Sequence, residues 1–277
     1  MIIQITLIKN ELFLLKEMIP HWQKYADAFV FMDDNSDDGT YEYLIKNKEK
    51  FNILNVLRTD TDKNKLAIES NIRQRLFDEA FKHSGNIICL DTDEYLDGTM
   101  SKQDLESVLD SNTDTLFHAQ WIQYTDKNQI RVDGPWRHNL KDRIGSYRNK
   151  ISFKYAQMHS EHLPVPAKQA IIPAPAIFIA HLQWLDKKTV AIKQYFWKIT
   201  DYVNRLKFNA KTIPASAYDA SVNNFNWEYA DIAFPLKVDP SVYSKQDATD
   251  NYKYKFIKNK INELNIPNLN DWGMGIH

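Results

Sequence analysis

The sequence predicts an α/β protein in which helices flank a mostly parallel sheet, with a helical extension at the C-terminus. Over the first hundred residues, apolar runs of strand length alternate with longer segments of helical periodicity, which is typical of βαβ crossovers. The runs are mostly apolar, as expected of strands buried on both faces. Helical periodicity then dominates from residue 186 onward.

Strands are expected where β-branched and aromatic residues cluster, over 2–8, 28–32, 53–57 and 86–90. Helices are expected between them, over 11–25, 41–50 and 65–83. Pro20 should kink or divide the first helix, because proline removes a backbone donor and clashes with the preceding turn.

The second half of the chain is less regular. Between residues 115 and 182, short apolar runs are mixed with prolines, which favours strands and loops. Apolar residues over 189–208 repeat at helical spacing, and 252–264 is a shorter, lysine-rich helix. That helix is either a solvated face or a weak contact with an anionic membrane surface. The simplest organisation is one α/β domain with a C-terminal helical extension.

Composition excludes several classes of function. The 277 residues carry a formal net charge of −1, so nucleic acid is not an expected partner. A single cysteine, Cys89, excludes a disulfide framework and a cysteine-based zinc site. None of the seven glycines falls into a dinucleotide fingerprint or a P-loop, so other groups must bind any phosphate. No apolar stretch has the length of a membrane span or signal peptide, and we expect a cytoplasmic protein.

An acidic turn, residues 33–40, follows the second predicted strand. Ligands bind at the carboxyl ends of the strands in parallel sheets. The turn also has a purely structural interpretation, in which Asp37, Asp38 and Thr40 cap the following helix. A calcium loop counted from Asp34 is excluded, because Ile45 stands where a bidentate glutamate is required.

A second acidic segment, Asp91-Thr92-Asp93-Glu94, follows the fourth predicted strand. Carboxylates at i and i+2 after a strand can both be directed at one hard cation. Oxygen ligands of this kind suit Mg²⁺ or Mn²⁺ bridged to a diphosphate. A phosphatase of the aspartyl-phosphate type is disfavoured, because Tyr95 stands where that class has Thr or Val.

Basic residues precede this second segment. Arg73 and Arg75 lie on the long predicted helix, and Lys65 lies upstream. They are either a solvated helix face or contacts to a diphosphate, which suits the fork of a guanidinium.

Three segments together resemble glycosyltransferase family 2: Ile3–Ile8 followed by Lys9-Asn10-Glu11, Val30–Thr40, and Ile88–Leu96. The resemblance is specific over residues 1–98. It implies the GT-A fold, a Rossmann-related α/β sheet, and inversion at the anomeric centre. It divides the chain into a nucleotide-sugar-binding half (1–98), an acceptor-binding and catalytic half of the same domain (99–185), and a helical extension (186–277). The DxDE form is similar to the branch that includes lipopolysaccharide-core glucosyltransferases.

The resemblance also implies roles for single residues. Asp34 would accept a hydrogen bond from the nucleobase, and Asp93 would ligate the metal with Asp91, which also contacts the ribose or metal-bound water. An apolar-histidine-aromatic segment of the same branch implies that His181 contacts the metal or diphosphate; the alternative is a structural histidine. The other expected donor-binding residues are Leu7, Lys9, Asn10, Glu11, Asn71, Arg75 and Thr92.

An inverting transfer needs a base that takes the proton of the acceptor hydroxyl. The densest titratable segment of the second half is 159–164. We expect Glu161 to be the base, with His159 as the second candidate; the alternative is a polar loop. Three tryptophans either form platforms for the acceptor sugar or pack in the core: Trp121, Trp136 and Trp184.

The expected function is therefore metal-dependent, inverting transfer of a hexose from a UDP- or GDP-sugar to a saccharide or glycolipid acceptor, as in polysaccharide or lipopolysaccharide biosynthesis. The expected cofactor is Mn²⁺ or Mg²⁺, and the expected location is the cytoplasm, with at most peripheral contact at the inner face of the membrane. Two alternatives remain: a catalytically inactive nucleotide- or sugar-binding module, and a sugar nucleotidyltransferase. The latter is disfavoured because the first strand is not followed by a glycine-rich loop.

Overall fold

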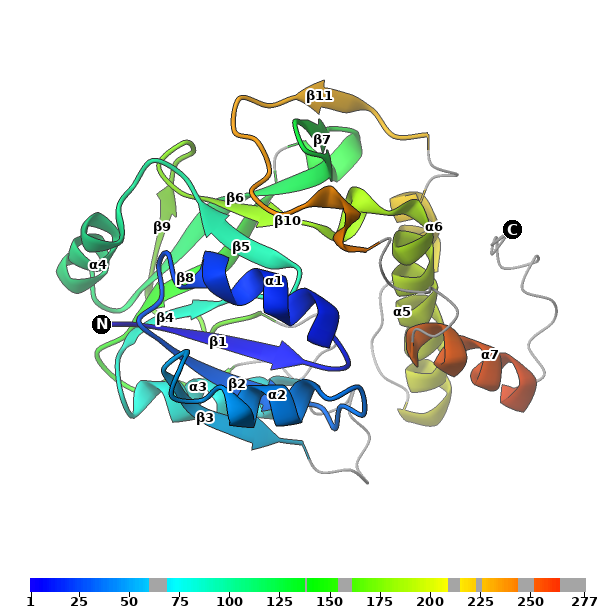
Figure 1. Ribbon diagram of the computed structural model, residues 1–277, viewed down its shortest axis with the longest axis horizontal. Helices are drawn as coiled ribbons and strands as arrows, with labels where there is room; N and C mark the ends of the chain where they lie inside the picture. Colours follow the sequence, from blue (N-terminus) through cyan, green and yellow to red (C-terminus); the bar gives the residue numbers. More distant parts are fainter. Residues whose placement is uncertain are drawn as a thin grey trace. The chain divides into compact units, whose positions relative to one another are not determined.

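The structure contains a group of parallel strands with helices on both faces (Figure 1). It is a computed structural model that describes residues 1–59, 69–137, 139–153, 161–208, 215–222, 226–243 and 252–264. This arrangement confirms the predicted α/β class. The chain divides into two compact units, residues 1–122 with 135–181 and residues 123–134 with 182–277. The functional division at residues 98 and 185 stays a prediction.

The first unit is built on four parallel strands in the order β4-β1-β2-β3. Ile3 of β1 lies opposite Ala28 on one side and Ile87 on the other, so β1 is one of the two inner strands of this group. Three helices connect the strands, as the alternating pattern predicts. The bounds are β1 Ile2–Ile8, α1 Leu12–Trp22, β2 Ala28–Asp33, α2 Thr40–Lys46, β3 Ile53–Arg58, α3 Glu69–Phe81 and β4 Asn86–Cys89.

Antiparallel strands extend the sheet beyond β4. β8 pairs with β4, β6 pairs with β8, and β9 joins β6 in parallel. A short strand after the second acidic segment, β5, pairs antiparallel with β10, which also pairs with β6. The bounds are β5 Glu94–Asp97, α4 Lys102–Ser111, β6 Thr115–Asp126, η1 Gly134–Trp136, β8 Leu140–Ser146, β9 Lys168–Ile172 and β10 Phe178–His181.

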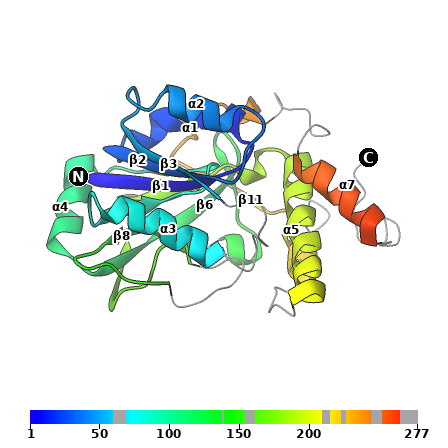
Figure 2. The ribbon, with the colours of Figure 1, turned by 90° about the horizontal axis from the view of Figure 1, so that it is seen from below.

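Alternate side chains of the parallel strands are buried on opposite faces. Val30 and Met32 of β2 pack with Leu76 of α3. Phe31 points the other way, and its ring lies 6.2 Å from that of Trp22 on α1. Figure 2 shows the corresponding layers, with α1 and α2 on one face of these strands and α3 on the other. Burial on both faces explains why residues 28–32 of β2 are continuously apolar.

The expectation that Pro20 divides the first helix is wrong. Pro20 lies within the last turn of α1, which continues to Trp22. Its neighbours Ile19 and Trp22 are fully buried, and this burial outweighs the missing backbone hydrogen bond. Two elements that the sequence pattern did not reveal, β5 and α4, directly follow the second acidic segment.

The second unit combines helices with short strands. The last residues of β6 pair with β7, and β7 pairs with β11. The predicted helices over 189–208 and 252–264 are present as α5 and α7, and Ile257 of α7 packs with Ile192 and Ile199 of α5. None of the described helices is long and apolar enough to cross a membrane. The bounds are β7 Gln129–Arg131, η2 Gln183–Leu185, α5 Lys187–Phe208, α6 Ala215–Val222, β11 Tyr229–Asp231, η4 Pro240–Val242 and α7 Tyr252–Leu264.

Candidate functional site

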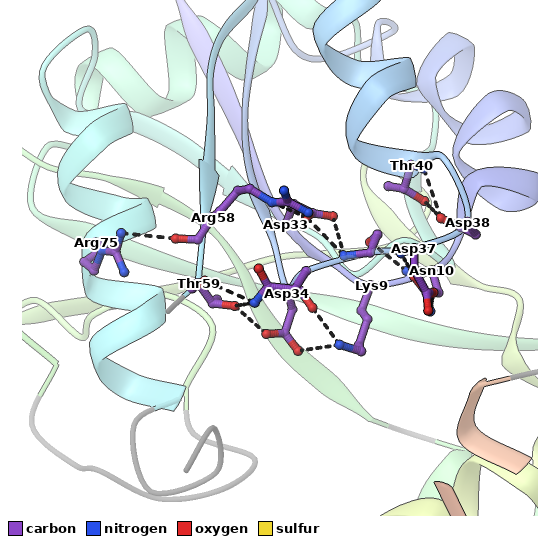
Figure 3. A network of polar contacts seen from close by, with 12 residues as sticks. Lys9, Asn10, Asp33, Asp34, Asp37, Asp38, Thr40, Arg58, Thr59 and Arg75 are labelled. Atoms are coloured by element: carbon purple, nitrogen blue, oxygen red, sulfur yellow. Dashed lines mark hydrogen bonds and ion pairs between the residues drawn. The ribbon is translucent and has the colours of Figure 1, made fainter. Parts of the chain in front are cut away.

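A polar network joins the carboxyl ends of β1, β2 and β3, with Asp34 at its centre (Figure 3). The Asp34 carboxylate accepts a hydrogen bond of 2.6 Å from the Thr59 hydroxyl and lies 3.4 Å from Lys9 Nζ. Lys9 Nζ also donates to the Asp34 carbonyl at 2.6 Å, and the Asp34 amide donates to the Ile8 carbonyl at 2.8 Å. Residues at the ends of three adjacent strands therefore fix this carboxylate beside an ammonium group.

The neighbouring carboxylates of the same turn have structural partners. Asp33 is fully buried and accepts a hydrogen bond of 3.1 Å from Arg58 Nε. Asp38 accepts 3.0 Å hydrogen bonds from the backbone amides of Leu12, in α1, and Thr40, in α2. The capping interpretation thus holds for Asp38, because its carboxylate satisfies amides at the start of two helices that have no partner within the helix.

Asp91 lies where the chain leaves β4, and its carboxylate is in contact with His162 and Arg143. Its Oδ2 atom lies 3.2 Å from His162 Nε2 and 3.5 Å from Arg143 Nη2. Although burial opposes ionisation, His162, Arg143 and Arg73 hold the pKa of the Asp91 carboxyl well below its usual range. Burial, followed by Arg143 and Arg73, holds the pKa of His162 well below its usual value. We therefore assign an ionised Asp91 and a neutral His162 at neutral pH.

Glu94 is the most deeply buried acid of the second acidic segment, and it forms a bidentate ion pair with Arg143 of β8. Both Arg143 Nε and Nη2 lie 2.8 Å from its carboxylate oxygens. The exposed fractions are 0% for Glu94 and 2% for Arg143. The Trp121 indole donates to the same carboxylate at 2.8 Å, and the Asp91 amide donates at 3.1 Å. A buried charge pair of this kind is most stable when its geometry is good and its other polar atoms are bonded. Here the geometry is bidentate, but Arg143 Nη1 is buried without a hydrogen-bond partner among the described residues.

Asp93 is buried next to His181, which ends β10. Its Oδ2 atom lies 3.4 Å from His181 Nε2. The His181 ring stacks on Trp121 of β6, with ring centroids 4.4 Å apart and an interplanar angle of 21°. The structure therefore brings together two of the three residues that were expected to contact a metal, Asp93 and His181.

The side chains of Asp93 and His181 end in donor atoms of the types that bind divalent cations. Within the described ranges, no group of three or more His, Cys, Asp and Glu side chains is placed to hold a metal ion. Asp93 and His181 offer one oxygen and one nitrogen ligand, and the Asp91 carboxylate precedes Asp93 by two residues. Mg²⁺ and Mn²⁺ are commonly held by one or two carboxylates, with phosphate oxygens and water completing the coordination.

The other predicted donor-binding residues lie in different parts of the structure. Lys9 and Asn10 are in the network of Figure 3, where the Asn10 amide nitrogen donates to Asp37 at 2.6 Å. Leu7 is half-buried against the core, and the Glu11 carbonyl accepts the first amide hydrogen bonds of α1. Thr92 is buried.

The predicted diphosphate- and donor-binding residues of α3 lie on two different faces of the helix. Asn71 and Arg75 are exposed, and Arg75 Nη2 donates to the Arg58 carbonyl at 3.3 Å. Arg73 is instead buried, with Nη1 3.9 Å from Cys89 Sγ, and its charge reaches Asp91. Burial raises the pKa of the Cys89 thiol to about 12, which excludes a thiolate nucleophile at neutral pH.

Of the two predicted bases, Glu161 is described and half-buried, whereas His159 lies outside the described residues, as does Lys65. Glu161 precedes His162, so the segment that carries it adjoins Asp91. Trp121 and Trp136 are neighbours, with ring centroids 5.9 Å apart. Trp184 is buried in the second unit, with its ring 5.2 Å from that of Trp227.

Sequence reasoning did not assign three residues that contact the site carboxylates. Thr59 follows a strand end, a position that could have signalled it. His162 belongs to the dense titratable segment that was noted. Arg143 carried no local signal, because it is 49 residues away from Glu94 in the sequence and only strand pairing brings the two together.

Comparisons with known proteins give only distant similarity. No protein-family model and no curated protein sequence matches the chain. Among solved structures, Staphylococcus aureus TarS matches at 14% identity and a TM-score of 0.43, covering 81% of this chain and 42% of TarS. TarS 1–349 in complex with UDP matches at 16% identity and a TM-score of 0.42, covering 81% and 70%. HddC from Yersinia pseudotuberculosis matches at 12% identity and a TM-score of 0.37, covering 66% and 94%. The chain thus spans less than half of TarS, and similarities at these TM-scores do not establish a function.

Proposed function

We propose that the chain is a metal-dependent, inverting glycosyltransferase that moves a sugar from a nucleotide-diphosphate donor to a saccharide or glycolipid acceptor. One observation carries the proposal: Asp34 and the Asp91–Asp93 segment follow the carboxyl ends of β2 and β4, which flank β1 in the same parallel sheet. Ligands bind at this edge of such sheets. The motif resemblance to glycosyltransferase family 2 over residues 1–98 supports the same assignment.

In this proposal Asp34 recognises the nucleobase. Thr59 and Lys9 hold its carboxylate in a fixed position, so that an N–H of the base can donate to it without further ordering of the side chain. Fixing an acceptor before the ligand arrives lowers the entropic cost of binding. Lys9 additionally places a positive charge beside the nucleotide.

Asp93, His181 and Asp91 are the residues that would hold the cation. When bound, Mn²⁺ or Mg²⁺ offsets negative charge that develops on the departing diphosphate. Arg73 and Arg143 keep Asp91 ionised, and His162 adds a hydrogen bond to the same carboxylate. The buried arginines thus maintain the ionised acid that such a site needs at neutral pH.

Glu161 is the proposed base. It takes the proton of the acceptor hydroxyl while the acceptor oxygen forms a bond to the anomeric carbon. The bond from that carbon to the diphosphate oxygen breaks, and the nucleoside diphosphate leaves with the electron pair. The position of Glu161 next to His162, which contacts Asp91, supports this role.

The test measures release of UDP or GDP from a panel of nucleotide-sugars with Mn²⁺, with and without saccharide acceptors. The wild-type protein should turn over one donor class, Asp93→Asn should lose the metal-stimulated rate, and Glu161→Gln should lower kcat by about 100-fold or more. Asp104→Asn, in the capping box of helix α4, is the matched control and should keep the wild-type rate. Binding of UDP or GDP without any turnover would instead identify a binding module and overturn the proposal.

A further inference from the structure

The Glu94 carboxylate collects hydrogen bonds from three separate segments. It accepts from Arg143 Nε and Nη2 on β8, from Trp121 Nε1 on β6, and from the amide of Asp91 at the end of β4. Its side chain has no exposed surface. Glu94 therefore cannot contact a substrate directly, and any effect it has on the site must pass through these partners.

Two routes lead from Glu94 to the carboxylates of the acidic segment. The first runs to Asp91, whose amide bonds to Glu94 and whose carboxylate shares the Arg143 guanidinium at 3.5 Å. The second runs through Trp121, whose indole N–H bonds to Glu94 and whose ring stacks on His181. His181 in turn lies 3.4 Å from Asp93. The buried Glu94 carboxylate is thus connected to Asp91 directly and through Arg143, and to Asp93 through Trp121 and His181.

We propose that Glu94 is a positioning residue. It orients the Asp91 and Asp93 carboxylates so that both can bind the same divalent cation. This inference rests on the proposed function for the cation but concerns only residues of the chain. Groups that orient the ligands of a metal typically change its affinity by about 10- to 100-fold when they are removed. The proposal therefore predicts loss of Mn²⁺ affinity from changes at residues that never touch the metal.

The experiment titrates the purified chain with Mn²⁺ and measures free Mn²⁺ by electron paramagnetic resonance, with and without UDP. Trp121→Phe keeps the aromatic stack on His181 but removes the N–H donor to Glu94, and it should weaken Mn²⁺ binding about 10-fold. The double variant Glu94→Gln with Arg143→Met removes the buried charges together and should weaken it at least as much. Glu94→Gln alone is less useful, because it leaves a buried guanidinium without its counter-charge and tests folding.

Trp22→Phe is the matched control, because the Trp22 indole donates to the backbone carbonyl of the same Glu94 at 2.7 Å. It should lower the melting temperature to a similar extent but leave Mn²⁺ affinity unchanged. Equal losses of affinity in Trp121→Phe and Trp22→Phe, unchanged affinity in Trp121→Phe, or a wild-type protein that binds no Mn²⁺ would each overturn the proposal. Absence of nucleotide-sugar turnover by a wild-type protein that does bind Mn²⁺ would overturn the proposed function alone, and the two phenylalanine variants would still decide the role of Glu94.

Discussion

At the scale of single residues, the acidic turn after β2 contains carboxylates with different tasks. Asp38 bonds to backbone amides of α1 and α2, and Asp33 is buried against Arg58. Asp34 is held by side chains from neighbouring strand ends. The acids of this turn, which look alike in the sequence, therefore have different partners in the structure.

This division leads to a prediction for nucleotide binding. Asp34→Ala should weaken the binding of UDP or GDP by about 10- to 100-fold, because it removes a charged hydrogen-bond acceptor worth about 1.5–3 kcal/mol. Isothermal titration calorimetry of the purified protein measures this change directly. Asp38→Asn should reduce stability but leave nucleotide affinity unchanged, so equal losses in both variants would contradict the separation of tasks.

At the scale of elements, the short strand β5 links the second acidic segment to β10. Glu94 starts β5, and His181 lies directly opposite Glu94 in the register of β10. The far end of β5 meets the chain before β10, where the Thr99 amide donates to the Pro175 carbonyl and the Met100 amide to the Ala176 carbonyl. The geometry of the site therefore depends on a tight approach at the end of this strand.

Gly98 makes that approach possible, and its replacement should be costly. Its φ angle is 144°, and a Cβ atom there would lie 2.1 Å from the Ala176 carbonyl oxygen. Gly98→Ala should lower the free energy of unfolding by about 2 kcal/mol or more, because backbone atoms rather than a flexible side chain must move. Urea denaturation followed by circular dichroism provides the measurement.

Gly134→Ala is the matched control for Gly98. Gly134 has a positive φ of 49°, but an added Cβ would meet nothing within 4 Å. The cost should therefore be limited to about 1–2 kcal/mol for the left-handed backbone. If the Gly98→Ala protein were no less stable than Gly134→Ala, the close approach of residues 98 and 176 would not be important for stability.

At the scale of the whole molecule, buried ion pairs make stability dependent on pH. In the second unit, Arg131 is 1% exposed and lies 2.6 Å from Asp133 through both Nε and Nη2. Its guanidinium also lies over the rings of Trp184 and Trp227, at 4.5 and 4.9 Å from their centroids. Although partial burial opposes ionisation, Arg131 holds the pKa of the Asp133 carboxyl below its usual value.

The sign of the effect follows from this lowered pKa. A carboxyl whose pKa is lower in the folded state stabilises the protein above its unfolded pKa of about 3.9, and this contribution is lost as pH falls through the folded-state pKa. Asp133→Asn should therefore lower the free energy of unfolding by about 3 kcal/mol at neutral pH and have a smaller effect near pH 3. Urea titrations at the two pH values test this, with the exposed Asp126→Asn as control. An equal loss at both pH values would contradict the assigned ion pair.

The sequence pattern predicts much of the fold because burial on both faces leaves a local signal. The runs that became β1 to β4 are mostly apolar, and α7 has the predicted bounds of 252–264. The pattern does not reveal β5, since Glu94 and Asp97 are buried acids that read as a polar loop. The predicted division of α1 at Pro20 does not occur, because the tertiary packing of Trp22 outweighs a local backbone preference.

The candidate site follows the same rule. Asp34, Asp91 and Asp93 are recognisable because each follows a strand end. Arg143 is not recognisable, because its role depends on the antiparallel pairing of β8 with β4. The role of Glu161 in catalysis and the role of His181 in metal binding stay predictions.

The burial of Glu94 has a consequence for how the protein is made. Residues 1–98, which carry the family resemblance, leave the ribosome first, and chains generally fold from the N-terminus as they are synthesised. At that stage the counter-charge of Glu94 has not been translated, because Arg143 lies on β8, and the partner strand of β5 ends only at His181. A buried carboxylate without its guanidinium is strongly unfavourable. Residues 1–98 thus cannot complete their own site, and its assembly must wait until Arg143 and His181 have also emerged.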